Sequence, residues 1–206
     1  MKILAFGFAI TLAIFAWHYA NRPITYPPGI LIASDPKQTS ITEAPITCGD
    51  FTLQPLAYLA LDARLLHLKI YRYDKQAALV PVDLALGWGP MSDQRVLDQI
   101  TVTQSMRFYW FDYKQPPISK EEIIAHSTNM HIIPSTKAIA SRCKSLRAGT
   151  LVHLEGNLVE ASAPNYGTWH SSVSRTDTGN GACELIWLKE ISVLTDLQTR
   201  SSLVTR

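Results

Sequence analysis

The sequence predicts a strand-rich α+β protein in which an N-terminal transmembrane helix precedes one compact domain. Three observations lead to this fold class: an apolar run over residues 3–20, alternation of apolar and polar residues over several later segments, and serines placed to cap short helices. The length of 206 residues fits one domain with an appendage. Because 17% of the residues are charged and 47% are hydrophobic, we exclude a disordered chain, a coiled coil and a protein with several membrane spans.

Residues 3–20, ILAFGFAITLAIFAWHYA, predict an uncleaved signal anchor. A helix of this length covers about 27 Å, close to the hydrocarbon thickness of a bilayer. Signal-peptide cleavage requires small residues at positions −3 and −1, and cleavage after Ala16 or Ala20 would place Ile14 or His18 at −3. A cleaved signal peptide and a buried helix are the alternatives. The short N-terminal tail favours export, so we expect a single-pass protein of the bacterial inner membrane, mostly periplasmic.

The rest of the chain divides into three parts. Residues 21–50 hold five of the 12 prolines, which lack an amide donor and have a fixed φ, so this stretch is interpreted as a Pro-rich linker that holds the domain away from the membrane. Residues 51–194 form the globular α+β domain. Residues 195–206 are a polar and loose tail.

Periodicity and capping residues give the expected elements of the domain. The predicted strands are residues 59–65, 100–110, 152–158, 169–175 and 183–193. A helix is the alternative for residues 59–65, because Leu and Ala are good helix formers. The predicted helices begin at Ser92, at Ser119 with a capping box to Glu122, and at Ser135. Residues 176–181 are expected to form a loop, and the last third suits a small barrel of the OB or SH3 kind.

Three segments resemble an uncharacterised proteobacterial family with an N-terminal hydrophobic anchor. They are DLALGWGPMSD at residues 83–93, HSTNMHIIP at 126–134 and SSVSRTDTGNGACE at 171–184. The resemblance covers roughly residues 50–190. It implies a membrane location and assigns no catalytic residue.

His126, Asn129 and His131 are the first candidate site, because imidazole groups serve both as metal ligands and as acid–base groups. An offset of five places the two histidines on opposite faces of a strand and about 140° apart on a helix. Only a break in the element would bring them together. Hydrogen-bonded structural residues are therefore the favoured interpretation, and an exported hydrolase that also uses Asp177 or Cys183 is the alternative.

Two further polar motifs receive a structural interpretation. Asp177 begins an Asp-Thr-Gly triplet, which is the signature of the aspartic peptidases. Catalysis by those enzymes needs two copies of the triplet and the chain has one, so a turn is expected. His170, Ser172 and Ser174 would share a strand face as solvated groups, because parallel side chains rarely form a nucleophile–base hydrogen bond.

Cys48, Cys143 and Cys183 form no C-x-x-C pair, which excludes a local zinc or thioredoxin-like site. A Cys143–Cys183 disulfide, buried inert thiols, and a Cys183 nucleophile activated by Arg175 all remain open. No metal site and no cofactor are predicted.

Trp88 and Arg175 are the candidate ligand-binding residues, since the glycines beside Trp88 permit close approach to a ligand. Core packing is the alternative for Trp88. Aromatic residues at 109, 110 and 113 could stack on bases, but a net charge of +2 makes nucleic acid an unlikely partner. We therefore expect a membrane-anchored extracytoplasmic protein that binds an envelope partner or a small ligand without catalysis.

Overall fold

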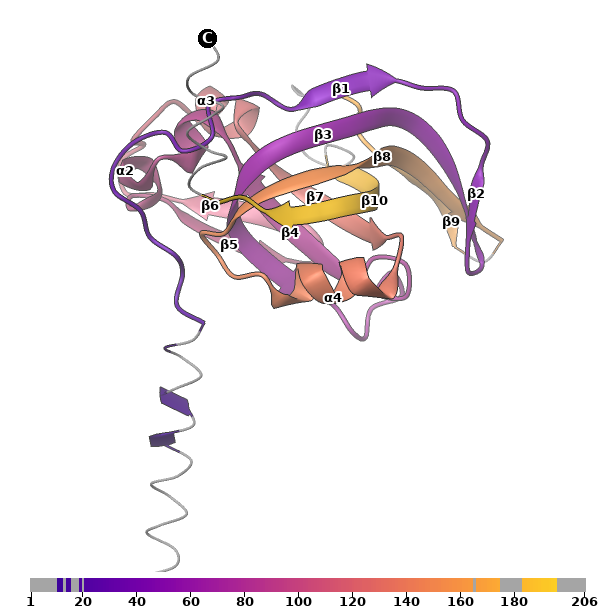
Figure 1. Ribbon diagram of the computed structural model, residues 1–206, viewed down its shortest axis with the longest axis horizontal. Coiled ribbons are helices and arrows are strands. Elements are labelled where there is room, and N and C mark those ends of the chain that lie inside the picture. Colours follow the sequence, from indigo (N-terminus) through magenta and orange to yellow (C-terminus); the bar gives the residue numbers. More distant parts are fainter. Residues whose placement is uncertain are drawn as a thin grey trace, which may run out of the picture.

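The chain folds around a closed barrel of strands (Figure 1). The computed structural model describes residues 11, 12, 14, 15, 19, 21–164, 166–174 and 183–195. Within this part, five strands pair in the circular order β3, β4, β7, β10, β8 and back to β3. Their bounds are β3 (Phe51–Ile70), β4 (Val82–Gly87), β7 (Ser127–Pro134), β8 (Leu151–Ala163) and β10 (Glu184–Val193). β7 and β10 run parallel, and the other pairs in the circuit are antiparallel.

The barrel closes because β3 is long enough to pair with two neighbours. Residues 52–64 pair with β8 and residues 64–70 pair with β4. Register shifts after Pro55 and after Leu65 mark bulges, which bend and twist a strand. The strand predicted at residues 59–65 is confirmed but is longer. The barrel expected in the last third draws its strands from residues 51–193, because alternation identifies strands without showing how they pair.

Apolar side chains from alternate positions fill the barrel interior. Leu59, Leu84, Met130, Leu154 and Ile186 are all fully buried in one cluster. β4 is buried at every position, and β7 at every position except Pro134. Such burial on both faces means that other parts of the chain cover the outside of these two strands.

The segment between β4 and β7 supplies most of that cover. It contains η1 (Gly89–Ser92), α2 (Gln94–Leu97), β5 (Thr101–Ser105), β6 (Phe108–Asp112) and α3 (Lys120–Ala125). The capping box between Ser119 and Glu122 is confirmed. The single strand predicted at residues 100–110 is wrong, because the chain turns back at Met106 and Arg107 with φ of 51° and 71°. These are left-handed values that residues other than glycine seldom adopt, so no sequence signal marked the turn.

In the last third of the chain the predicted helix and strands are present, but they begin or end at different residues from those predicted. Helix α4 (Lys137–Ser145) is capped by Thr136 rather than Ser135. β9 (Gly167–His170) forms a hairpin with β8 and ends earlier than the strand predicted at residues 169–175. The loop expected at residues 176–181 lies outside the described residues, and so does the tail apart from residue 195.

The linker expected at residues 21–50 is instead attached to the barrel. β1 (Lys37–Ser40) and β2 (Ile46–Cys48) pair with β3. Residues 24–32, which we call the strap, pack along the segment that contains η1 and α2. The Ser92 hydroxyl accepts hydrogen bonds from the amides of Leu31 and Ile32, and Ile32 is only 2% exposed. The strap thus uses polar side chains at residues 92–94 as partners for its backbone, a pairing that proline content does not reveal.

Asp93 makes the attachment of the strap dependent on pH. Its carboxylate accepts hydrogen bonds from the amides of Gly29 and Arg95. Hydrogen bonds from the Arg95 side chain, aided by those two amides and opposed by burial, lower the pKa of Asp93 to about 2. The resulting stability is present above the ordinary pKa of about 3.9 and is lost as the pH falls toward 2.

We therefore expect Asp93→Asn to lower the free energy of unfolding at neutral pH by on the order of 2 kcal/mol. The difference from wild type should shrink below pH 4. Urea unfolding at several pH values measures this difference, with Asp35→Asn as the control, because Asp35 is exposed and lies beyond the end of the strap. A loss that is constant from pH 7 to pH 2 would contradict the assignment.

No helix among the described residues is long and apolar enough to cross a membrane. Residues 3–20, which carry the predicted anchor, lie mostly outside that part of the chain.

Candidate functional site

The polar residues of greatest interest lie on the outer face of β4 and β7. Met130 and Ile132 point into the barrel, so the alternating residues Asn129 and His131 point outward. Asp83 is the register partner of His131 across the antiparallel β4–β7 pair. Both side chains are buried, Asp83 completely. A buried acid and a buried histidine thus occupy adjacent positions outside the core.

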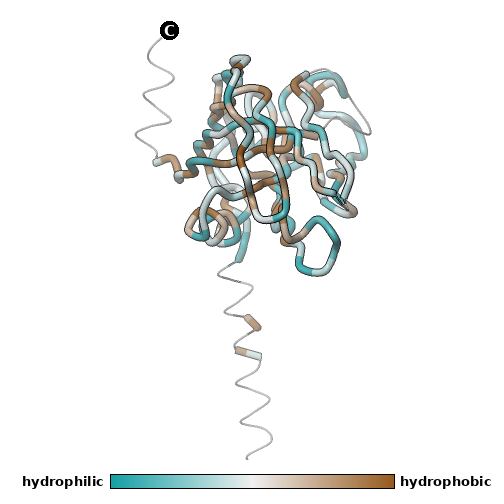
Figure 2. The backbone as a smooth tube through the Cα atoms, turned by 90° about the vertical axis from the view of Figure 1, so that its right-hand side faces the viewer, coloured by the Kyte–Doolittle hydropathy of each residue, from teal (hydrophilic) through white to brown (hydrophobic). Residues whose placement is uncertain are grey.

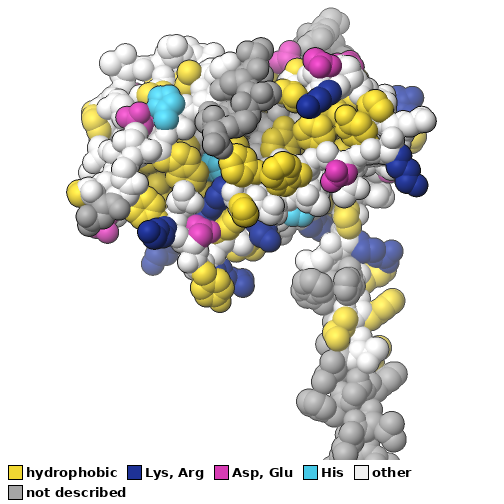
Figure 3. Space-filling view, turned by 180° about the vertical axis from the view of Figure 1, so that it is seen from behind, with side chains coloured by type: hydrophobic (Ala, Val, Ile, Leu, Met, Phe, Trp, Pro, Cys, Tyr) yellow, Lys and Arg dark blue, Asp and Glu magenta, His cyan; other side chains and the backbone are white. Residues whose placement is uncertain are grey.

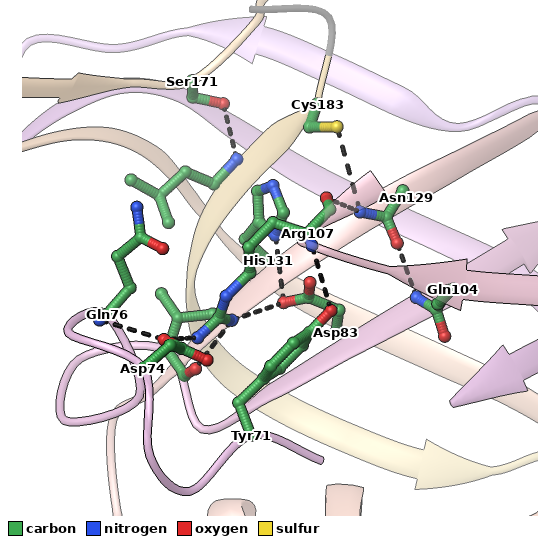
Figure 4. Close-up of polar contacts among 12 residues, drawn as sticks. Tyr71, Asp74, Gln76, Asp83, Gln104, Arg107, Asn129, His131, Ser171 and Cys183 are labelled. Atoms are coloured by element: carbon green, nitrogen blue, oxygen red, sulfur yellow. Dashed lines mark hydrogen bonds and ion pairs between the residues drawn. The ribbon is translucent and has the colours of Figure 1, made fainter. Parts of the chain in front are cut away.

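Asp83 is approached by two basic groups. His131 Nδ1 lies 2.9 Å from Asp83 Oδ1, and Arg107 Nη1 lies 3.1 Å from the same oxygen (Figure 4). The imidazole also packs against the Trp169 ring at 4.8 Å between centroids. Figure 4 shows the opposite edge of the imidazole facing the side on which Ser171 and Cys183 lie.

Arg107 reaches the barrel from the strained turn between β5 and β6. Its guanidinium bonds Asp74 at 2.6 Å as well as Asp83, and it lies 3.6 Å from the centroid of the Tyr71 ring. The Tyr71 hydroxyl accepts a hydrogen bond from the Arg107 amide. Burial, reinforced by the negative charge of Asp83, raises the pKa of Tyr71 to about 12. The hydroxyl therefore stays protonated at neutral pH, and the turn is tied to the loop between β3 and β4.

Asn129 links the same turn to Cys183, the residue before β10. Its amide nitrogen donates to the Arg107 carbonyl at 2.9 Å and to Cys183 Sγ at 3.8 Å, and its oxygen accepts from Gln104 at 2.5 Å. Gln104 also contacts His67 Nδ1 at 2.8 Å. We refer to Asp83, Gln104, Arg107, Asn129, His131 and Cys183 together as the outer polar cluster.

Some hydrogen-bonding capacity in the outer polar cluster is unused. Within the described part of the chain, Asp83 Oδ2 and Arg107 Nε are buried and make no hydrogen bond. His131 Nδ1 is near enough to Asp83 for an ion pair but is not aligned for a hydrogen bond. Buried polar atoms are nearly always paired, so these atoms mark a place where water or a ligand could supply the missing partners.

The predicted candidate residues are dispersed by the fold. His126 ends α3 as a half-buried cap, with its Nδ1 2.9 Å from the Glu122 carbonyl, and does not join His131. Trp88 is 2% exposed and belongs to the barrel core. Asp177 and Arg175 lie outside the described residues. Among the candidates, Asn129 contacts Cys183 and shares the outer face of β7 with His131. Metal-binding groups of His, Cys, Asp or Glu are not found among the described residues.

The three cysteines are free thiols, so the Cys143–Cys183 disulfide is not formed. Cys143 is buried in the barrel core, whereas Cys183 lies on the outer face beside Asn129. Burial raises the pKa of Cys143 to about 12, which makes this thiol unreactive at neutral pH.

Sequence reasoning missed Asp83, Gln104 and Arg107. Asp83 did carry a signal, because it is the single charged residue in the apolar stretch 79–86. Arg107 carried no signal, because alternation placed it on the polar face of a strand, whereas Gln104 shares the parity of the apolar residues Val102 and Met106.

Comparisons with protein-family models, with curated proteins and with solved structures find no match for this chain.

Proposed function

We propose that the chain is a membrane-anchored extracytoplasmic protein whose barrel is of the OB class and binds a partner or small ligand without catalysis. Numbered along the chain, the barrel strands follow the order 1-2-3-5-4 with strand 1 also paired to strand 4. Strands 3 and 5 are parallel, and α4 connects strands 3 and 4. These are the features of an OB barrel.

The observation that carries the binding proposal is the position of the outer polar cluster. OB barrels bind ligands on the outer face of strands 2 and 3, between the loops that join strands 1–2 and 4–5. In this chain, that face belongs to β4 and β7, and it holds Asp83, Asn129 and His131. The adjoining loops contribute Tyr71, Asp74 and Cys183. A face built only for stability would bury apolar groups there, because buried charges are costly.

A photo-cross-linking amino acid placed beside this face tests the proposal in the native membrane. Met106, which precedes Arg107 in the turn between β5 and β6, and Trp110 on β6 are 79% and 55% exposed, and neither belongs to the outer polar cluster. We expect adducts at both positions and none at Asp50, an exposed residue in the turn between β2 and β3. An active alkaline phosphatase fused after Arg206 in the same strain is the control for export. Equal labelling at all three positions, or none at any, would refute the binding face.

One observation favours a hydrolase as the second candidate. The Asp83–His131 contact resembles the acid–base half of a catalytic triad, and Cys183 lies on the side that the imidazole faces (Figure 4). The Cys183 sulfur accepts a hydrogen bond from the Asn129 amide nitrogen, and His126 of the predicted hydrolase site does not join His131. Binding is therefore the function that the geometry supports better.

A further inference from the structure

The first residues of the strap fix where the chain enters the domain. The Ile24 amide donates to the Ala148 carbonyl at 2.8 Å, in the turn that follows α4. The Ile24 carbonyl accepts from the Arg64 guanidinium at 3.1 Å. The entry point is thus held beside the C-terminal end of α4.

This entry point lies very close to the proposed membrane anchor. The apolar run ends at residue 20, and four residue steps separate it from Ile24. An extended chain spans at most about 3.6 Å per residue, so Ile24 lies within about 15 Å of the end of the run. The headgroup layer on each side of a bilayer is itself several ångströms thick. The α4 end of the domain is therefore held at the membrane surface, not on a long spacer.

The same end of the domain is positively charged. Helix α4 presents Lys137, Arg142 and Lys144 as exposed side chains, and residues 123–154 contain no acidic residue. Among the described residues, these three side chains form no ion pair. Figures 1 and 2 show the loop between β3 and β4 projecting on the same, lower side as α4. Lys and Arg side chains follow this lower edge in Figure 3.

The loop between β3 and β4 adds to this charge. It exposes Arg72 and Lys75, while its acidic residue, Asp74, is held by Arg107 at 2.6 Å. At its tip, Tyr73 is 96% exposed. Tyrosine is enriched at the membrane–water interface, where its ring and hydroxyl face different environments. We call Arg72, Lys75, Lys137, Arg142 and Lys144 the basic edge.

We propose that the basic edge binds the anionic headgroups of the membrane in which the protein is anchored, and thereby fixes the orientation of the barrel. This inference rests on the proposed membrane anchor. Cationic side chains are attracted to anionic lipid surfaces within a Debye length, and the short connection brings the α4 end of the domain close to such a surface. Docking holds the outer polar cluster at a defined height above the bilayer.

Lysine acetylation of the full chain in nanodiscs tests the proposal. The labelling rates of Lys75, Lys137 and Lys144 are compared in discs of phosphatidylglycerol and of phosphatidylcholine. We expect at least threefold slower labelling in the anionic discs. Lys37, exposed on β1 at the opposite side of the domain, is the internal control and should label at the same rate in both (Figure 1).

A pair of charge-reversal variants separates docking from simple proximity. Arg142→Glu/Lys144→Glu should restore fast labelling of Lys75 and Lys137 in anionic discs. Lys37→Glu/Lys120→Glu, with both residues exposed on the upper side in Figure 1, should leave the protection intact. A chain retained in the discs whose lysines label equally in both lipids refutes docking alone. A chain that is not retained in the discs refutes the anchor, and docking with it.

Discussion

Asp83→Ala is expected to lower the free energy of unfolding by about 3–5 kcal/mol, because it leaves a buried arginine and a buried histidine without their carboxylate. The Arg107 side chain is 11% exposed and His131 is 3% exposed, so water cannot replace the lost partner without rearrangement. The strained turn that carries Arg107 also loses one of its main attachments to the barrel. Thermal or urea unfolding of the full chain in detergent measures the loss.

Asp74→Ala is the matched control for this experiment. Asp74 binds the same guanidinium at 2.6 Å, but its side chain is 36% exposed, and an ion pair in water contributes at most about 1 kcal/mol. If the two alanine variants are equally stable, the outer polar cluster is open to solvent. That result would also remove the argument that buried charge marks the binding face.

The sequence predicted local structure better than it predicted pairing. Helix α3 could be predicted because the side chains of Ser119 and Glu122 each accept a hydrogen bond from the other's backbone amide, only three residues away. Closure of the barrel could not be predicted from the sequence, because it depends on the pairing of β3 with β8 about a hundred residues later. Alternation predicts which face of a strand is buried, but it does not predict which strand lies beside it.

The candidate site was predictable only in fragments for the same reason. Asn129 and Cys183 meet because β7 and β10 pair in parallel, 54 residues apart in the sequence. Arg107 reaches Asp83 only because the chain reverses at two residues with left-handed backbone angles, where glycine or asparagine would have been the recognisable signal. A lone acid in an apolar strand, as at Asp83, is the feature from which this site could have been found.

The second large effect concerns the turn that receives the strap. Gly149 has φ of 89°, and a β-carbon there would lie 2.0 Å from the Ile24 carbonyl oxygen. Gly149→Ala therefore adds a collision with the strap backbone to the strain of a left-handed alanine, which is about 1–2 kcal/mol. We expect a total loss of several kcal/mol, or release of the strap with faster proteolysis at residues 21–32.

Gly167→Ala separates the two contributions. Gly167, the first residue of β9, has φ of 72°, and a β-carbon there would meet no atom within 4 Å. This variant should show only the backbone strain and leave proteolysis of the strap unchanged. Urea unfolding and limited proteolysis of both variants measure the difference. Equal losses would mean that the Gly149 turn does not hold Ile24 in solution, and the short connection between the anchor and α4 would no longer position the basic edge at the membrane.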